Sequence, residues 1–187
     1  ISSSLAHTVK RLEIEQSGDY NLSGDRYRTV AVQGIQKYPL VNLGEVSEFI
    51  RGVTFSSNHK VENEQEHVLI ATTKAAQADG LHYDDLVKVD PSVVKKDKQY
   101  LQDGDLLISI ANSASLLGRK TYITNLPHDL KYSFGAFMGC VRPDQNVILP
   151  GYLNPFLESK EYKGFCLSRA NTTTNVSDLN WSDLSEF

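Results

Sequence analysis

The chain has 187 residues, of which 40% are hydrophobic and 22% are charged, and its formal net charge is −4. These values fit one domain of ordinary size with an appendage and exclude a chain that is disordered throughout. The sequence shows no apolar run long enough to cross a bilayer and no signal segment at its start. We therefore predict a cytoplasmic protein without a membrane partner.

Charge is unevenly distributed along the sequence. Acidic residues dominate between residues 61 and 105, whereas basic residues dominate from 106 to 175. The acidic total argues against a protein that binds nucleic acid through bulk charge, but the uneven distribution favours one locally cationic face. The alternative interpretation is that these charges only keep the surface hydrated.

The two cysteines and five histidines do not form a metal-binding pattern. Cys140 and Cys166 each lie among apolar neighbours, which predicts buried, reduced thiols. No glycine-rich phosphate loop is present either. We therefore predict no metal, no cofactor and no catalytic residue within this chain.

Residues 1–38 differ from the rest of the chain and predict a connector. Apolar residues at helical spacing continue only as far as Leu12, and the periodicity is then lost. A segment this short cannot form a hydrophobic core alone, so we expect it to pack on another domain. The main domain is predicted to span residues 39–187.

The first part of this domain predicts a short helix and then a strand. Apolar residues at helical spacing predict one to two helical turns over residues 43–52. The β-branched run 67–73 predicts a buried strand. The end of that strand presents three polar side chains, Thr72, Thr73 and Lys74.

The stretch Tyr100–Lys120 contains the clearest strand of the sequence. Asp103–Gly104 predicts a tight turn, because glycine allows a positive φ, and Leu106–Ala111 has the length of a buried strand. The stretch ends in small polar residues and two adjacent cations, Arg119 and Lys120. Such an exit suits contact with a polyanion, although an ordinary solvated loop explains the same residues.

The remainder of the chain predicts two strands and a helix. Thr121–Thr124 and Ser133–Arg142 are expected to be strands, the second of them curved by its glycines. A helix is predicted from Pro150, with Pro155 in its first turn. Together these elements predict the α+β class, with several short strands and few helices.

The polar run Arg169–Asn175 is a second candidate for DNA contact. Arginine binds guanine through two hydrogen bonds, asparagine binds adenine, and threonine offers both a hydroxyl and a methyl group. Small polar residues also bind phosphates. A surface loop rich in Ser, Thr and Asn is the alternative.

A short pattern suggests a different, catalytic function. Asp144, Glu158 and Lys160 match the loose signature of restriction-type nucleases, in which two carboxylates hold Mg²⁺ and a lysine lies near the attacked phosphate. Glu158 and Lys160 fall in a segment of helical periodicity, where residues two apart point to different sides. A Mg²⁺-dependent nuclease therefore stays as the alternative function.

Several tracts, in order, resemble the target recognition domain of type I restriction-modification specificity subunits. They are Leu43–Phe55, Leu101–Gly118, Ser133–Pro143, Pro150–Tyr162 and Asn175–Leu184. The resemblance covers about residues 40–187, and it is the order of the tracts that makes it specific.

The resemblance implies a compact α+β recognition domain with a curved, mostly antiparallel sheet, a few short helices and loops that contact DNA. A complete subunit of that family carries two such domains joined by long helices, so we expect a fragment or a half-subunit. Tyr20–Arg28 resembles the tail that follows adenine-N6 methyltransferase domains, as in a fused polypeptide. The implied partners are double-stranded DNA, an adenine-N6 methyltransferase subunit or domain with its S-adenosylmethionine, and a restriction subunit.

We therefore predict a non-catalytic DNA recognition module that directs adenine-N6 methylation and restriction by its partners. The predicted DNA-contacting residues are Thr72, Thr73, Lys74, Ser113, Ser115, Arg119, Lys120, Arg169, Asn171, Thr172, Thr173 and Thr174. Lys74, Arg119 and Lys120 are expected to hold phosphates, whereas Arg169, Asn171 and the threonines are expected to contact bases. A module that docks a methyltransferase without touching DNA is a third possibility.

Overall fold

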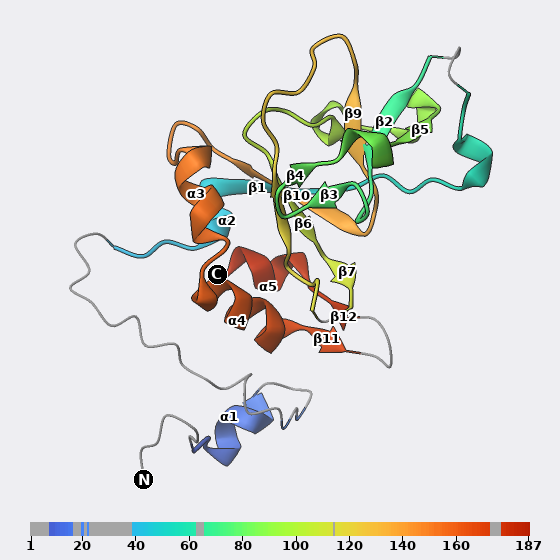
Figure 1. Ribbon diagram of the computed structural model, residues 1–187. Helices are drawn as coiled ribbons and strands as arrows, with labels where there is room; N and C mark the ends of the chain where they lie inside the picture. The colour runs from blue at the N-terminus through green and yellow to red at the C-terminus, as the bar shows by residue number, and fades with distance from the viewer. Residues whose placement is uncertain are drawn as a thin grey trace.

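The computed structural model describes residues 8–16, 20, 22, 39–62, 66–113, 115–172 and 177–187 (Figure 1). Short helices and short strands alternate through residues 39–187, which confirms the expected α+β class. Within the described residues, no helix is long and apolar enough to cross a membrane.

A four-stranded antiparallel sheet lies at the centre of the fold. In the order β1-β10-β6-β8, its strands are Ser47–Arg51, Met138–Pro143, Leu106–Ser109 and Lys120–Tyr122. The pairing of Phe49 with Val141 and of Cys140 with Leu107 fixes the register. All four side chains of β6 are buried, so this strand is the core strand that the apolar run predicted.

The two faces of this sheet pack against different clusters. Leu106, Ile108 and Val141 belong to a cluster that includes the helices, whereas Leu107 and Cys140 belong to a second cluster on the other face. Alternate residues of a strand point to opposite faces, so a strand buried on both faces needs an unbroken apolar run. Both cysteines are buried free thiols, as expected.

The helices next to the sheet gather on one side of it, where Figure 1 shows α2, α3, α4 and α5. These helices span Leu43–Val46, Pro150–Phe156, Lys160–Arg169 and Trp181–Ser185. Their buried side chains, Leu43, Leu153, Tyr162 and Leu184 among them, form the cluster that covers Leu106 and Ile108. A further helix, α1, spans Arg11–Gln16 in the predicted connector.

Three smaller sheets complete the fold. The sheet β5-β2-β9 comprises Val87–Val89, Val68–Ala71 and Tyr132–Phe134. The hairpin β3-β4 comprises Ala76–Gln77 and Gly80–Leu81, and the sheet β11-β12-β7 comprises Asn171–Thr172, Ser177–Asp178 and Ala111–Asn112. Short 3-10 turns span Ser57–His59, Tyr83–Asp85, Pro91–Val93 and Asp97–Gln99. Among the named strands, β2 and β9 form the parallel pair and the other pairs are antiparallel.

The helix predicted over residues 43–52 is wrong beyond Val46, because β1 replaces it from Ser47. Phe49 packs edge-on against Trp181 with ring centroids 5.2 Å apart, while Ile50 enters the cluster on the opposite face. The half-buried Phe49 and the buried Ile50 are adjacent in sequence and thus lie on the two faces of a strand. The spacing of the apolar residues alone did not distinguish this arrangement from a helix.

Two further boundaries differ from the prediction. Ser133–Arg142 is not one strand, because a turn closed by the Met138 amide and the Gly135 carbonyl (2.9 Å) separates β9 from β10. Pro155 is not in a first turn but next to the end of α3, where it suits the break before α4. Ser159 caps the new helix by accepting a hydrogen bond from the Tyr162 amide.

Candidate nucleic-acid interface

The small sheet β11-β12-β7 brings together two of the predicted DNA-contacting loops. Asn112 pairs with Ser177, and Ser177 pairs with Thr172, so the end of β7 lies in line with the end of β11 and the start of β12. Asn112 and Thr172 are sixty residues apart in sequence yet occupy one row of this sheet. The two polar runs therefore share one edge of the molecule.

The loop after β7 is exposed and internally hydrogen-bonded. The Ser113 amide donates to the Asn112 side chain (2.8 Å), and the Leu116 amide donates to the Ser113 carbonyl (2.9 Å). The hydroxyls of Ser113 and Ser115 are exposed and 3.2 Å apart. Both side chains point to solvent on a defined backbone, an arrangement that allows contact with a phosphate or a base edge.

Arg119 joins this loop to the turn after β2. Its guanidinium donates to the carbonyls of Thr73 (2.6 Å) and Ala76 (2.9 Å) and to the side-chain oxygen of Gln77 (2.9 Å). Burial lowers the pKa of Arg119 below its usual value. Both terminal nitrogens of Arg119 are engaged within the fold, so a phosphate contact by Arg119 stays a prediction that would require these hydrogen bonds to be shared or exchanged.

Lys120 also has an internal role. Its side chain is only 5% exposed, and its ammonium pairs with Glu158 (2.8 Å) and donates to the Asn154 side chain. Cavities of about 360 and 430 Å³ flank this contact. A buried and paired lysine does not reach a phosphate in this conformation, so the phosphate contact of Lys120 stays a prediction that this arrangement does not favour.

The turn after β2 completes the polar edge, which we define as Thr72–Lys74, residues 113 and 115–118 after β7, and the strands β11 and β12. Thr72 and Thr73 are half-buried, and Lys74 is exposed with its ammonium against Asp85. An exposed ion pair contributes little to stability, so Lys74 can exchange Asp85 for a phosphate at small cost.

The second polar run is described only in part. The backbones of Asn171 and Thr172 form β11, whereas Thr173 and Thr174 lie outside the described residues. Arg169 ends α4, lies over the Phe165 ring at 5.5 Å, and is 3.9 Å from Asp183 and 3.7 Å from Glu186. These are long, partly exposed contacts, and they leave the Arg169 guanidinium accessible to other acceptors.

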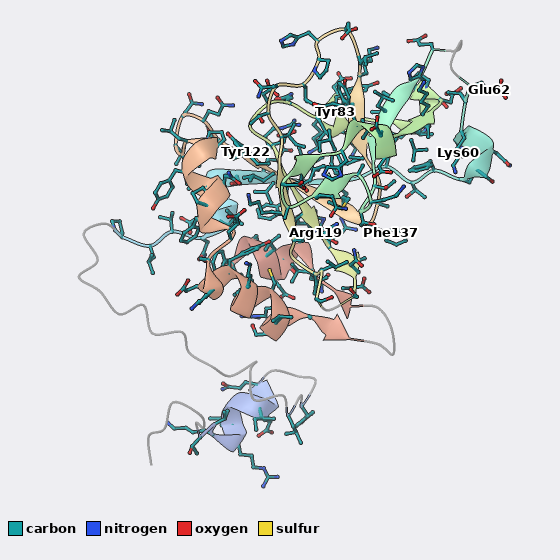
Figure 2. All side chains as sticks on the ribbon, in the orientation of Figure 1. Lys60, Glu62, Tyr83, Arg119, Tyr122 and Phe137 are labelled. Carbon is teal, nitrogen blue, oxygen red and sulfur yellow. The ribbon has the colours of Figure 1, made fainter. Side chains whose placement is uncertain are left out.

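Two residues that the sequence did not single out lie next to the polar edge. Lys163 is exposed on α4, lines the smaller cavity together with Ser115 and Arg119, and makes no ion pair within the described part of the chain. Phe137 is 68% exposed, and its carbonyl accepts a hydrogen bond from the Ile110 amide just before β7 (Figure 2). Nothing in the local sequence marks either residue, because their positions depend on contacts between distant segments.

Two of the three residues of the alternative nuclease signature have partners of their own. Asp144 accepts hydrogen bonds from the backbone and side-chain amides of Asn146, both at 2.9 Å, whereas Glu158 pairs with Lys120. Lys160 begins α4 and is exposed. Across the described ranges, no group of three or more His, Cys, Asp and Glu side chains is arranged to hold a metal ion.

Comparison with solved structures identifies the architecture. A chain from a study of the assembly and conformational transition of a type I restriction-modification system matches with a TM-score of 0.56 and 20% identity. The HsdS subunit from Thermoanaerobacter tengcongensis matches with a TM-score of 0.53 and 21% identity. Each match covers 95% of this chain. The chain has the fold of part of an HsdS subunit.

The HsdS-like fold confirms the architecture that the resemblance implied. The chain spans 41% and 39% of the two matched structures, so it corresponds to less than half of each. No protein-family model and no curated protein matches the sequence. At 20% and 21% identity, the similarity shows the fold alone and assigns no role to individual residues.

Proposed function

We propose that this chain recognises a double-stranded DNA sequence for a type I restriction-modification system. In this proposal, residues 39–187 form the recognition domain and residues 1–38 connect it to a methyltransferase region. Recognition directs adenine-N6 methylation and restriction, which partner subunits or domains perform. The chain itself supplies no catalytic group, and S-adenosylmethionine belongs to the methyltransferase.

The observation that carries this proposal is the polar edge within an HsdS-like fold. Three polar segments that are distant in sequence converge there, through the β7–β12 pairing and through Arg119. Their side chains are hydroxyls and amides, which hydrogen-bond to base edges and phosphates. The described ends of these segments lie on short strands, which would hold the polar side chains in register with the DNA.

The proposal assigns phosphate contact to the accessible cations rather than to the buried ones. Lys74, Lys163 and Arg169 are exposed or half-exposed next to the polar edge. Arg119 and Lys120 instead hold the loops in place. The chain has a net charge of −4 and few accessible cations, so its nonspecific electrostatic affinity for DNA should be low. The affinity for DNA should then depend on specific contacts and on the partner subunits.

The test measures DNA binding by the complex of this chain with its methyltransferase partner. Selection from a random-sequence duplex library should enrich one motif. Lys163→Ala should weaken binding and reduce the slope of log affinity against log salt by about 1, without changing the motif. Lys96→Ala is the control, because Lys96 is exposed and precedes the turn Asp97–Gln99, which is none of the segments of the polar edge.

Two outcomes would replace the proposal with its alternatives. Cleavage of plasmid DNA in Mg²⁺ that is abolished by Glu158→Ala would establish the nuclease. If the complex assembles but enriches no duplex sequence at all, the chain is a docking module for the methyltransferase.

A further inference from the structure

An exposed aromatic side chain, Phe137, lies in a turn between two buried residues. Phe134 and Met138 are 0% and 1% exposed, whereas Phe137 is 68% exposed. The Met138 amide donates to the Gly135 carbonyl (2.9 Å), which places Phe137 near the apex of a tight turn. Removing an exposed apolar ring from water is favourable, so Phe137 would gain hydrophobic free energy if a partner covered it.

The turn is rigidly mounted. The Gly135 amide donates to the Ala71 carbonyl (2.9 Å), and the Val53 amide donates to the Phe134 carbonyl (2.8 Å). Gly52 approaches so closely that a Cβ there would lie 2.2 Å from the Gly135 carbonyl oxygen. The backbone of the turn is therefore held by several contacts, and it presents the Phe137 side chain to solvent.

The same hydrogen bonds place Phe137 between the segments of the polar edge. Ala71, which binds the Gly135 amide, directly precedes Thr72–Lys74. Ile110, whose amide binds the Phe137 carbonyl (3.1 Å), directly precedes β7, and its carbonyl accepts from the Leu179 amide (2.8 Å) after β12. Phe137 is thus an exposed apolar side chain whose backbone is linked to segments that lead into the polar edge.

We propose that Phe137 contacts DNA bases directly, by stacking on or wedging into one base step of the recognised sequence. This inference rests on the proposed function and adds an apolar contact to it. Aromatic rings stack on bases that leave the helical stack, and apolar wedges inserted at a step partly unstack it. The hydrogen-bonding side chains of the polar edge would fix the register of the domain on the DNA. The free energy of inserting the neutral ring would depend on how easily that base step deforms, and this depends on the DNA sequence.

The experiment uses the complex with the methyltransferase and a short duplex that carries the sequence whose adenine methylation depends on this chain. 2-Aminopurine replaces one adenine at a time, because its fluorescence rises when it unstacks, and the methylated adenine is left in place because a methyltransferase itself flips its target base. The wild-type complex should raise the fluorescence at one step, and Phe137→Ala should abolish that rise and weaken binding by about tenfold to a hundredfold. The salt slope should not change, because no charge is removed.

Two matched variants separate stacking from a general defect. Phe137→Trp keeps a large aromatic ring and should retain the fluorescence rise. Tyr152→Ala removes a 66% exposed aromatic ring from α3 and should leave binding and fluorescence unchanged.

Each other outcome overturns the inference in a distinguishable way. If Phe137→Ala binds as tightly as the wild type with the same fluorescence, Phe137 does not touch bases, although the recognition function stands. If Phe137→Ala no longer copurifies with the methyltransferase, the ring belongs to a protein interface. If the wild type shows no preference for the duplex, the proposed function fails as well.

Discussion

Asp105 and Arg142 form a buried ion pair between the turn before β6 and the end of β10. Arg142 donates through Nε (2.7 Å) and Nη2 (2.8 Å) to the two carboxylate oxygens, and Nη2 also reaches the Tyr100 carbonyl (2.8 Å). The Gln102 amide donates to the same carboxylate (2.9 Å). A single acidic residue of the tight turn thus holds together the turn, the core strand and its neighbour.

Asp105→Ala should lower the free energy of unfolding by about 3–5 kcal/mol, because it leaves the Arg142 charge without its partner in the core. Asp84→Ala, at an exposed carboxylate, should change it by less than about 0.5 kcal/mol. Urea titration of both variants checks this. Similar midpoints for the two would show that the buried pair is not needed.

Arg119 gives a prediction that separates an internal role from DNA contact. Arg119→Ala leaves the carbonyls of Thr73 and Ala76 without their donor, so it should lower stability by about 1–3 kcal/mol. At a temperature where the variant is folded, the salt slope of DNA binding should equal that of the wild type. A slope reduced by about 1 would instead indicate a direct phosphate contact by Arg119.

The buried thiol of Cys166 predicts how stability changes in alkali. Burial raises the pKa of Cys166 from 9.0 to about 11, and burial also raises the pKa of Cys140 and of Tyr162. The unfolded chain therefore releases protons first, and stability that is complete below about pH 9 is lost as the pH rises through about 11. Each unit of pKa shift corresponds to about 1.4 kcal/mol.

Cys166→Ala should make this alkaline loss of stability shallower but not abolish it, because Cys140 and Tyr162 remain. Thermal unfolding across pH 8 to about 11 measures the effect. An identical dependence of stability on pH for the variant and the wild type would show that folding does not raise the pKa of Cys166.

Two glycines, one in the loop after β7 and one inside α4, differ in the space around them. Gly118 has a φ of +73°, and a Cβ there would lie 2.6 Å from the Cys166 sulfur. Gly164, inside α4, has no atom within 4 Å of the corresponding position. The same substitution should therefore have opposite effects at the two sites.

Gly118→Ala should destabilise the fold by more than about 2 kcal/mol, through backbone strain and the clash with Cys166. Gly164→Ala should stabilise it by about 1 kcal/mol, because alanine favours the helix. Differential scanning calorimetry of the two variants measures both shifts. A loss of stability from Gly164→Ala would contradict the open surroundings of that position.

The elements differ in how far the sequence could predict them. The tight turn at Gly104, with a φ of +96°, and the buried strand β6 follow from local residue types, and both are confirmed. The helix predicted over 43–52 failed because β1 places one apolar residue on each of its faces, Phe49 and Ile50, at positions that also fit helical spacing. The strands also fall into four sheets rather than one, since their pairing depends on distant partners.

For the whole molecule, the sequence predicted the polar segments but not which side chains are accessible in them. Arg119 binds groups more than forty residues away, and Lys120 binds Asn154 and Glu158 from a different element. Such contacts leave no local signal in the sequence. Phe137 was missed for the same reason, because only the folded chain places it between the polar segments.

The most direct test of DNA recognition by this chain is a map of adenine methylation in the source genome. The map is compared between the wild type, a strain that lacks this coding region, and that strain complemented with the wild-type chain. One methylated sequence motif should disappear on deletion and return on complementation. A methylation map that is identical in all three strains would contradict the proposal that this chain directs adenine methylation to a DNA sequence.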